Sequence, residues 1–359
     1  PFFLIIMFPA AVSGIPGISL NSATQFLPIT NIALLFKEMM KGGVSVDMAF
    51  GVLMSTMAYA LLALIVAAWV FQREELMLAD SHGTTMPMRR IYLVPKEVPP
   101  AGLGLLVYCV ALLLIFYLGT FVQLRFPVFG LLLTQWGFLL FPAVFVVWYA
   151  KINFKNTFHL HRPTALQIIS ALCLTFGWLL IVLQLNVWIQ RVFPVPTEIE
   201  QDMEWVLERV ASRIGILGLY LAAAFSPAVC EEALFRGVLL SSLRRHVPGW
   251  VVCLLIAAMF GILHLNVYRF PVTFLSGVVL TYLVWRSNSI FLGFLSHFMF
   301  NGLTLWLHRG PMPKDLQAVL VQPLQEGDNL PVYLLVAAFL SCTLGILLIE
   351  WETPKRRSA

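Results

Sequence analysis

Charged residues are scarce in this sequence, and this scarcity excludes a soluble globular domain. Asp, Glu, Lys and Arg make up 11% of the 359 residues, whereas 60% are hydrophobic. Soluble domains carry about 25% charged residues. The sequence therefore predicts an all-α, polytopic transmembrane helix bundle. Its net charge of +5 favours contact with anionic membrane lipid, and we expect no nucleic acid partner.

Cysteine is also scarce, and its spacing excludes a disulfide framework or a cysteine-based zinc site. No His-Glu-x-x-His sequence occurs, so the helical signature of many zinc proteases is missing as well. The chain begins with Pro1 instead of Met, inside an apolar run, and we interpret it as a fragment that lacks its natural start. The cysteines lie singly in apolar segments, at Cys109, Cys173, Cys230, Cys253 and Cys342.

Long apolar stretches are what the sequence has instead. An α-helix needs about 20 apolar residues to cross a bilayer, and we expect about nine full spans plus a partial N-terminal segment. A polar segment at 197–213 with apolar residues at helical spacing predicts an amphipathic helix on the membrane surface. The predicted spans are 47–71, 101–124, 127–149, 165–189, 214–240, 250–264, 271–285, 290–307 and 331–349.

The distribution of positive charge predicts the orientation of these spans. Alternation places the loops at 72–100, 150–164, 241–249 and 286–289 on one side, together with the C-terminal tail. This side carries the larger share of the 23 Lys and Arg residues. Because positively charged loops stay in the cytoplasm, we expect a cytoplasmic C-terminus. We expect the chain to be an integral protein of the bacterial inner membrane.

Two adjacent carboxylates, Glu231 and Glu232, interrupt an apolar span. A charge at the centre of a membrane helix costs roughly 2.5 to 3.5 kcal/mol, so such residues mark functional cavities. They could instead be helix-end charges that face headgroups. However, Arg244, at the expected helix end, lies about 20 Å further along at 1.5 Å per residue. The two carboxylates are therefore expected deep in the membrane, with Arg236 as the nearest partner.

The other polar residues within spans fall on two further helices and at a similar depth. A single histidine in a membrane helix usually makes an interhelical hydrogen bond, and Arg236 is expected to neutralise Glu232. Their joint occurrence favours one common pocket, because carboxylates, imidazoles and a carboxamide can activate water and stabilise an oxyanion. The pairs spaced one helical turn apart are Glu232 with Arg236, Phe260 with His264, and His297 with Asn301.

Three segments carry a family resemblance: E-E-A-L-F-R at 231–236, F-G-I-L-H at 260–264 and H-F-M-F-N at 297–301. Together they resemble the motifs of the CAAX-processing and bacteriocin-processing intramembrane endopeptidases. The resemblance implies hydrolysis of peptide bonds in membrane-associated protein or peptide substrates, without a cofactor.

The same resemblance implies a role for each motif residue. Glu231 would be the general base, His264 would help to hold the water, and His297 and Asn301 would donate to the oxyanion. An alternative mechanism uses zinc held by Glu231, His264 and His297. The metal-free mechanism is favoured, partly because a carboxamide such as that of Asn301 is a poor zinc ligand. The residues expected to shape the site are Glu232, Arg236 and Phe260.

The N-terminal part carries a second resemblance, in G-I-P-G-I-S-L at 14–20, L-P-I-T-N at 27–31 and L-L-F-K-E at 34–38. These segments resemble the C-terminal end of permease subunits of sodium- or drug-exporting ABC transporters. The resemblance implies a fused permease and an ABC ATPase subunit as a partner. It also leaves two competing functions open, an exporter permease with a non-catalytic protease-like domain, and a non-catalytic scaffold or immunity protein.

These patterns together predict the domain organisation. The polar stretch that ends in Pro99-Pro100 is the expected boundary. The predicted parts are a permease remnant at 1–78, a cytoplasmic linker at 79–100, a protease domain at 101–350 with its motif core at 213–307, and a basic cytoplasmic tail at 351–359.

Overall fold

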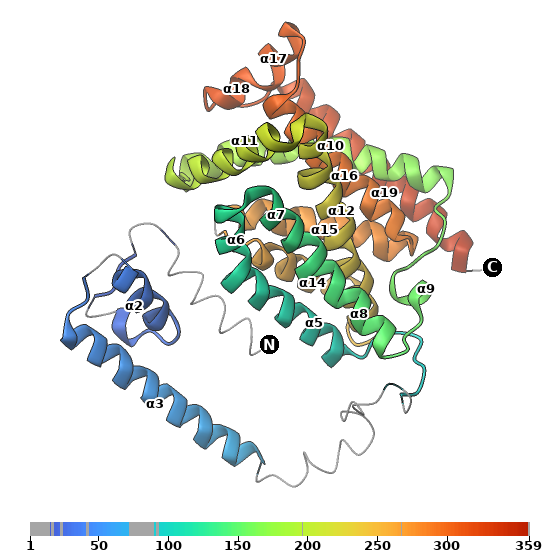
Figure 1. Ribbon diagram of the computed structural model, residues 1–359. Coiled ribbons are helices and arrows are strands. Elements are labelled where there is room, and N and C mark those ends of the chain that lie inside the picture. Colours follow the sequence, from blue (N-terminus) through green and yellow to red (C-terminus); the bar gives the residue numbers. More distant parts are fainter. Residues whose placement is uncertain are drawn as a thin grey trace. The chain divides into compact units, whose positions relative to one another are not determined.

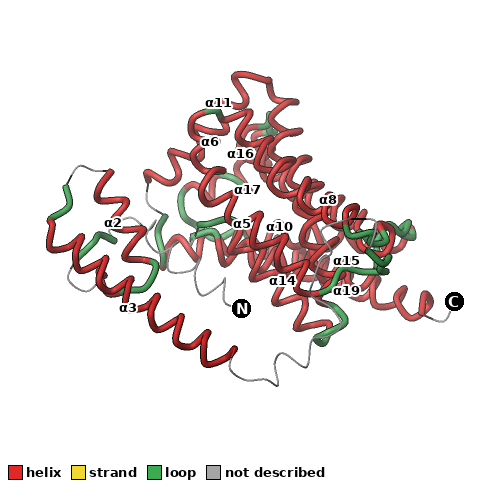
Figure 2. Tube along the Cα trace, turned by 60° about the horizontal axis from the view of Figure 1, so that its bottom comes forward, coloured by secondary structure: helices red, strands yellow, loops and turns green. Residues whose placement is uncertain are grey.

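Helices form the whole regular structure of the described chain in this computed structural model (Figures 1 and 2). No β-strand occurs among the described residues, where one isolated bridge joins Lys96 to Ile152. The predicted all-α fold is therefore confirmed. The described residues are 15, 18–21, 24–40, 43–71, 90, 93–195, 197–266 and 268–357.

The chain divides into two units, Pro1–Tyr92 and Leu93–Ala359. The first contains a short 3₁₀ helix (η1, Thr24–Phe26), α2 (Thr30–Met40) and α3 (Val46–Phe71), and α3 agrees with the span predicted at 47–71. The buried Asn31 ties them together, because its Nδ2 donates to Ser55 Oγ at 2.8 Å and to the Gln25 carbonyl at 3.1 Å. Most of residues 1–20, where the partial N-terminal segment is expected, and most of the linker at 79–100 lie outside the described residues.

The second unit contains the remaining helices, several of which include π-helical turns. In chain order the segments are α5 (Ala101–Leu114), η3 (Ile115–Gly119), α6 (Thr120–Arg125), α7 (Pro127–Leu132), η4 (Leu133–Leu140), α8 (Phe141–Tyr149), α9 (Phe154–Thr157), α10 (Ala165–Val192), α11 (Thr197–Tyr220), η5 (Leu221–Phe225), α12 (Ser226–Glu232), η6 (Ala233–Leu239), α13 (Leu240–Leu243), α14 (Gly249–Leu263), α15 (Phe270–Ser287), α16 (Ile290–Arg309), α17 (Lys314–Leu320), α18 (Gln322–Gln325) and α19 (Val332–Arg357).

Six of the helices in the described part of the chain are long and apolar enough to cross a membrane. They are Pro127–Tyr149, Ala165–Val192, Glu204–Leu243, Phe270–Ser287, Ile290–Arg309 and Val332–Thr353. The other predicted spans contain shorter apolar helices, Met48–Met57, Ala101–Leu114 and Gly249–Leu263. The chain is a polytopic helical membrane protein, as predicted.

Helix α14 matches the predicted span at 250–264 to within one residue at each end. Helix α14 has 15 residues and ends at Leu263, and Leu265, two residues later, takes a left-handed φ of 51°. A side chain with a Cβ rarely adopts this conformation, which interrupts helical hydrogen bonding. At 1.5 Å per residue, α14 is about 22 Å long and ends short of the roughly 30 Å hydrocarbon core. His264 therefore lies at a helix end within the bundle.

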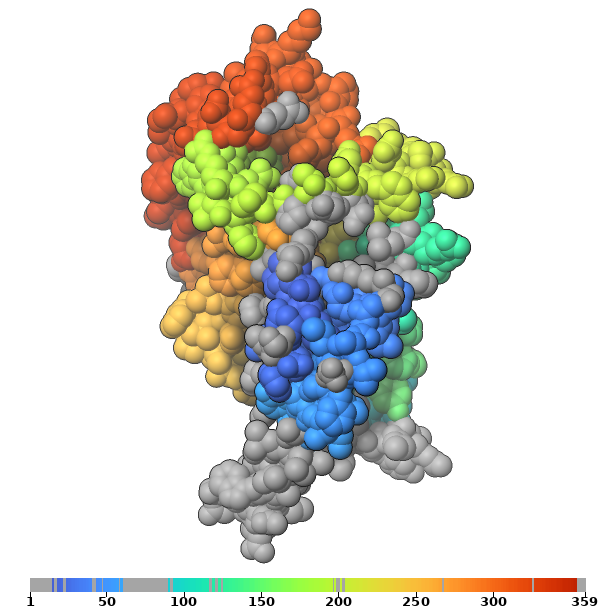
Figure 3. All heavy atoms as spheres, turned by 90° about the vertical axis from the view of Figure 1, so that its left-hand side faces the viewer, coloured from blue at the N-terminus to red at the C-terminus, as the bar shows by residue number. Residues whose placement is uncertain are grey.

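The predicted amphipathic helix and the following span meet at a sharp bend. Gly215, inside α11, has φ 72° and ψ 175°, which breaks the helical path two residues after Arg213. A positive φ favours glycine, so this residue marks the turn from one helix into the next. An ion pair between Glu204 and Arg309 joins the α11 side of the bend to the end of α16. Helices α17 and α18 lie at the same end of the unit, uppermost in Figures 1 and 3.

Helices α10 and α19 pack closely because small residues line their contact. A Cβ on Gly177 would lie 2.6 Å from the Ala338 carbonyl, and a Cβ on Gly345 would lie 2.8 Å from the Ser170 carbonyl. Ser170 Oγ also donates to the Gly345 carbonyl at 2.6 Å. Small residues and interhelical hydrogen bonds of this kind hold membrane helices together where lipid offers no hydrophobic driving force.

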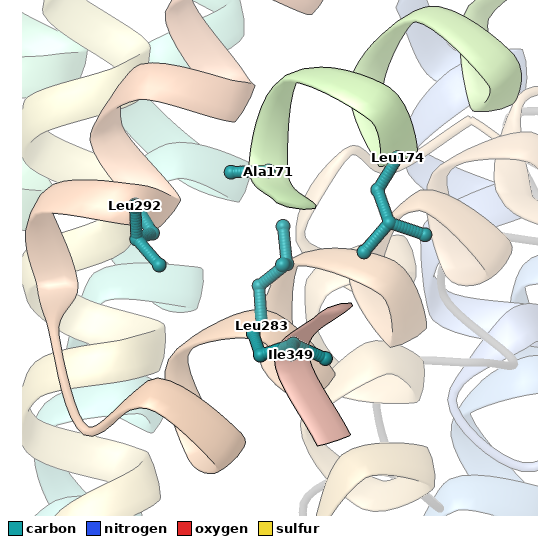
Figure 4. Close-up of a cluster of buried hydrophobic side chains, with 5 residues drawn as sticks. All are labelled: Ala171, Leu174, Leu283, Leu292 and Ile349. Carbon is teal, nitrogen blue, oxygen red and sulfur yellow. The ribbon is translucent and has the colours of Figure 1, made fainter. Parts of the chain in front are cut away.

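Near one end of this contact, four helices share an apolar cluster (Figure 4). Its buried members come from α10, α15, α16 and α19, and the ends of α15 and α19 that follow it are thereby held next to each other. The cluster consists of Ala171, Leu174, Leu283, Leu292 and Ile349.

Candidate active site

Three neighbouring helical segments carry all the predicted site residues. Glu231 and Glu232 end α12, and Arg236 lies in the π-helical segment η6 that continues it. His264 follows α14, and His297 and Asn301 lie on α16. π-Helical turns inside membrane helices are frequent at functional sites because the wider turn redirects side chains. The structure brings most of these residues into one buried cluster.

Glu232 is the most buried acid of this cluster, and it accepts hydrogen bonds from an arginine and a histidine. Its Oε1 accepts from Arg236 Nη1 at 2.7 Å and from His297 Nδ1 at 2.9 Å. The side chains of Glu232 and Arg236 are both 0% exposed. The ion pair predicted from their spacing is thus present, and it also holds an imidazole from a different helix.

Arg236 extends this interaction to α15. Its Nε donates to Thr281 Oγ1 at 3.2 Å, and its Nη2 donates to the Gly277 carbonyl at 3.1 Å. Its guanidinium carbon lies 4.7 Å from the centroid of the Phe260 ring, a cation–π contact. A buried guanidinium that is paired and hydrogen-bonded on three nitrogens avoids the penalty of an uncompensated charge.

Phe260 lies between the guanidinium and both imidazoles. Its ring centroid is 4.8 Å from that of His264 and 6.0 Å from that of His297, edge to face in both cases. His264 Nδ1 also donates to the Phe260 carbonyl at 2.8 Å. Because Nδ1 carries this proton, Nε2 of a neutral His264 is the nitrogen that accepts. Phe260 therefore fixes the distance between the two histidines.

The two carboxylate oxygens of Glu231 have different surroundings. Oε1 accepts a hydrogen bond from Gln135 Nε2 at 3.0 Å. Oε2 is buried, has no hydrogen-bond partner among the described residues and lies 3.8 Å from His297 Nε2. The carboxylate is therefore held at one oxygen, while the other faces the imidazole.

Asn301 is the predicted site residue that the structure ties least to the cluster. It lies on α16 one turn after His297 and is partly exposed. No hydrogen bond joins its side chain to another described residue, so none of the described residues fixes the direction of its amide. Its predicted role as an oxyanion donor stays a prediction.

The predicted zinc alternative has no preformed ligand set in the described part of the chain. No group of three or more His, Cys, Asp or Glu side chains there is arranged to hold a metal ion. The bond of His297 Nδ1 to Glu232 leaves Nε2 for another partner and does not argue against a metal. Glu231, His264 and His297 are neighbours without converging on a common point.

Two functional neighbours were missed from the sequence. Gln135 lies in η4, next to Trp136, whose Nε1 donates to Ser226 Oγ at 2.9 Å and joins η4 to α12. As a polar residue inside the predicted span 127–149, Gln135 could have been found by counting amides as well as ionisable groups. Gly293 lies one turn before His297, and a Cβ there would be 2.5 Å from Glu232 Oε2. No sequence signal shows this contact.

Comparison with protein families matches part of the chain. Residues 213–303 match the family described as Rce1-like, type II CAAX prenyl endopeptidase Rce1-like. The match does not extend to residues 1–78, and the permease resemblance of that part stays a prediction. No curated protein and no solved structure matches the chain.

The matched residues include the helices that form the buried cluster. The ion pair, the Phe260 ring and both histidines all lie within 213–303, whereas Gln135 lies outside it. Residues 213–303 therefore form an Rce1-like domain of the CAAX protease family, a family of intramembrane proteases, within a polytopic helical membrane protein.

Proposed function

We propose that this protein is an intramembrane glutamic endopeptidase that hydrolyses peptide bonds of membrane-associated proteins or peptides. The observation that carries the proposal is the asymmetry of the Glu231 carboxylate. Gln135 holds Oε1, whereas Oε2 is buried without a hydrogen-bond partner among the described residues, beside His297. An oriented carboxylate with one available oxygen can act as a general base.

In the proposed reaction, Glu231 Oε2 takes a proton from water, and the water oxygen attacks the scissile carbonyl carbon. His264 Nε2 accepts the second hydrogen of that water and so orients it. The carbon–nitrogen bond then breaks, and the proton held by Glu231 passes to the leaving amine. No metal or cofactor enters these steps.

The hydrogen bond of His297 to the Glu232 carboxylate supports a role for His297 as an oxyanion donor. Because Nδ1 donates to Glu232, only a doubly protonated ring can also donate from Nε2. We propose that His297 and Asn301 stabilise the oxyanion, while Glu232, Arg236 and Phe260 keep His297 in place.

The N-terminal resemblance adds a proposal of its own. We propose that the protease is fused to an exporter permease that associates with an ABC ATPase subunit, in the bacterial inner membrane with the C-terminus in the cytoplasm. The competing function, an exporter permease with a non-catalytic protease-like domain, requires the Glu231 carboxylate to be dispensable. The family description makes a prenylated CAAX peptide the first substrate to assay, beside an unprenylated membrane peptide.

Substitution of the proposed base tests the function directly. Glu231→Gln keeps the shape of the side chain and removes its basicity, and we expect cleavage to fall by about 10² to 10⁴-fold. Cleavage of a fluorescent peptide in detergent micelles and the unfolding temperature are to be measured together. Glu208→Gln, on the exposed surface of α11, is the matched control and should leave both unchanged. Full cleavage by Glu231→Gln would exclude the proposed base.

Gln135 provides a second, independent test because it lies outside the family match. Gln135→Met keeps the volume and cannot donate to Glu231 Oε1, and a hydrogen bond to a charged group contributes about 1.5 to 3 kcal/mol. We expect kcat to fall by about 10 to 100-fold with little change in KM, because the carboxylate is present but less well oriented. Gln190→Met, at an exposed position of α10, is the control. An unchanged kcat would show that Gln135 does not position the base.

We expect Arg236 to contribute mainly to the stability of the folded protein. Arg236→Ala leaves the Glu232 carboxylate buried without its cation, which typically costs about 3 to 5 kcal/mol. The double variant Glu232→Leu with Arg236→Leu removes both charges and should recover much of the loss. Thermal unfolding in detergent measures both. A normal unfolding temperature for Arg236→Ala together with lost cleavage would assign Arg236 to the reaction instead.

Chelation separates the two proposed mechanisms. A zinc site loses activity when metal is removed and recovers it when zinc is added back. The proposed glutamate mechanism predicts unchanged cleavage after exhaustive chelation and no stoichiometric metal by elemental analysis. One zinc per chain with chelator-sensitive, zinc-restorable cleavage would replace this mechanism and leave the protease function intact.

A further inference from the structure

A basic pocket lies in the second unit, at the helix ends next to the apolar cluster of Figure 4. Its volume is about 560 Å³, in the range of small-molecule sites. The residues that line it include three arginines and a histidine, and none of the described lining residues is Asp or Glu. The basic ones are His161, Arg162, Arg244 and Arg286.

All parts of this pocket come from one side of the predicted topology. His161 and Arg162 belong to the loop at 150–164, Arg244 to 241–249, Asn288 to 286–289, and Thr353 to the C-terminal tail. Alternation of the spans assigns these segments to the same membrane surface, the one expected to face the cytoplasm. The cytoplasmic leaflet carries anionic lipids.

Arg244 is held in place at the pocket wall. Its Nη1 donates to Asn288 Oδ1 at 3.0 Å and lies 3.4 Å from His159 Nδ1. Burial, and then the charge of Arg244, lower the pKa of His159 to about 3, so this imidazole is neutral at physiological pH. Its Nε2–H can donate to Ser241 Oγ at 3.1 Å, which leaves Nδ1 as an acceptor for Arg244.

Arg286 is positioned by α19 and by an aromatic wall. It pairs with Glu350, which also accepts from Tyr282 Oη at 2.6 Å. Its guanidinium carbon lies 5.2 Å from the Trp285 ring centroid, and its Nε is buried without a hydrogen-bond partner among the described residues. Glu350 thus balances the charge of Arg286.

We propose that this pocket binds a phosphate-bearing anion, supplied either as the headgroup of an anionic phospholipid or as free phosphate. Guanidinium groups present donors in a rigid fork that matches phosphate oxygens. Arginines from three separate chain segments converge here on a space of headgroup size. The site is distinct from the proposed catalytic cluster, since Arg244 lies about 20 Å beyond Glu231 along the same helix at 1.5 Å per residue.

Binding to the purified full chain in detergent micelles tests the proposal. Phosphatidylglycerol, phosphatidylcholine with the same acyl chains, and inorganic phosphate are to be titrated separately, with affinity and unfolding temperature as readouts. Each arginine near an anionic surface contributes enough for about a fivefold change in affinity. We therefore expect Arg244→Gln and Arg162→Gln each to weaken binding about fivefold. Arg245→Gln, an exposed neighbour that is not among the lining residues, should change it less than twofold.

The outcomes separate the sources of the anion. Binding of phosphatidylglycerol but not of phosphatidylcholine or inorganic phosphate assigns the site to a lipid headgroup. Binding of inorganic phosphate that Arg244→Gln weakens assigns it to free phosphate. Equal losses of binding affinity in Arg245→Gln and Arg244→Gln would overturn the proposal, because surface charge alone would then explain binding. Equal affinity for both lipids would also overturn it, because the acyl chains alone would then explain binding. Since Arg162 is exposed, Arg162→Gln keeps the test valid even if Arg244→Gln lowers stability without ligand.

Discussion

The buried ion pair of Glu232 and Arg236 is the interaction around which the site is assembled. Two opposite charges at 0% exposure in a membrane helix are acceptable only when their remaining polar atoms find partners. Those partners come from elsewhere in the bundle, as His297 on α16 and Thr281 on α15. The need to satisfy one ion pair therefore brings separate helices together.

Phe260 adds α14 to this arrangement without a polar bond. Its ring lies over the guanidinium and meets both imidazoles by their edges, so the electrostatics of the ion pair and the spacing of the histidines depend on one side chain. Helix α14 ends at Leu263, directly before His264, and Leu265 then adopts a left-handed φ. A helix that stops within the bundle presents an imidazole at its end.

The sequence predicted local features well and tertiary contacts incompletely. Apolar length and breaking residues gave helices close to α10 and α16, and a one-turn spacing gave the ion pair, because these depend on neighbours along the chain. Gln135 reaches the site from η4, and Gly293, on α16 itself, meets Glu232 of α12, so both contacts depend on packing that no periodicity encodes. The end of α14 was predicted to within one residue from its apolar composition, whereas the left-handed conformation of Leu265 that follows it has no signal in the sequence.

The close contact of α10 with α19 also constrains how the protein is made. Gly177 meets a partner helix that begins at Val332, so the groove around it is filled only after the intervening chain has been synthesised. At 5 to 20 residues per second this takes on the order of ten seconds or more. During that interval the surface of α10 around Gly177 lacks the helix that fills it, and the Ser170 hydroxyl lacks its Gly345 acceptor. Completion of the bundle is thus a late event of translation, set by a contact between helices far apart in the chain.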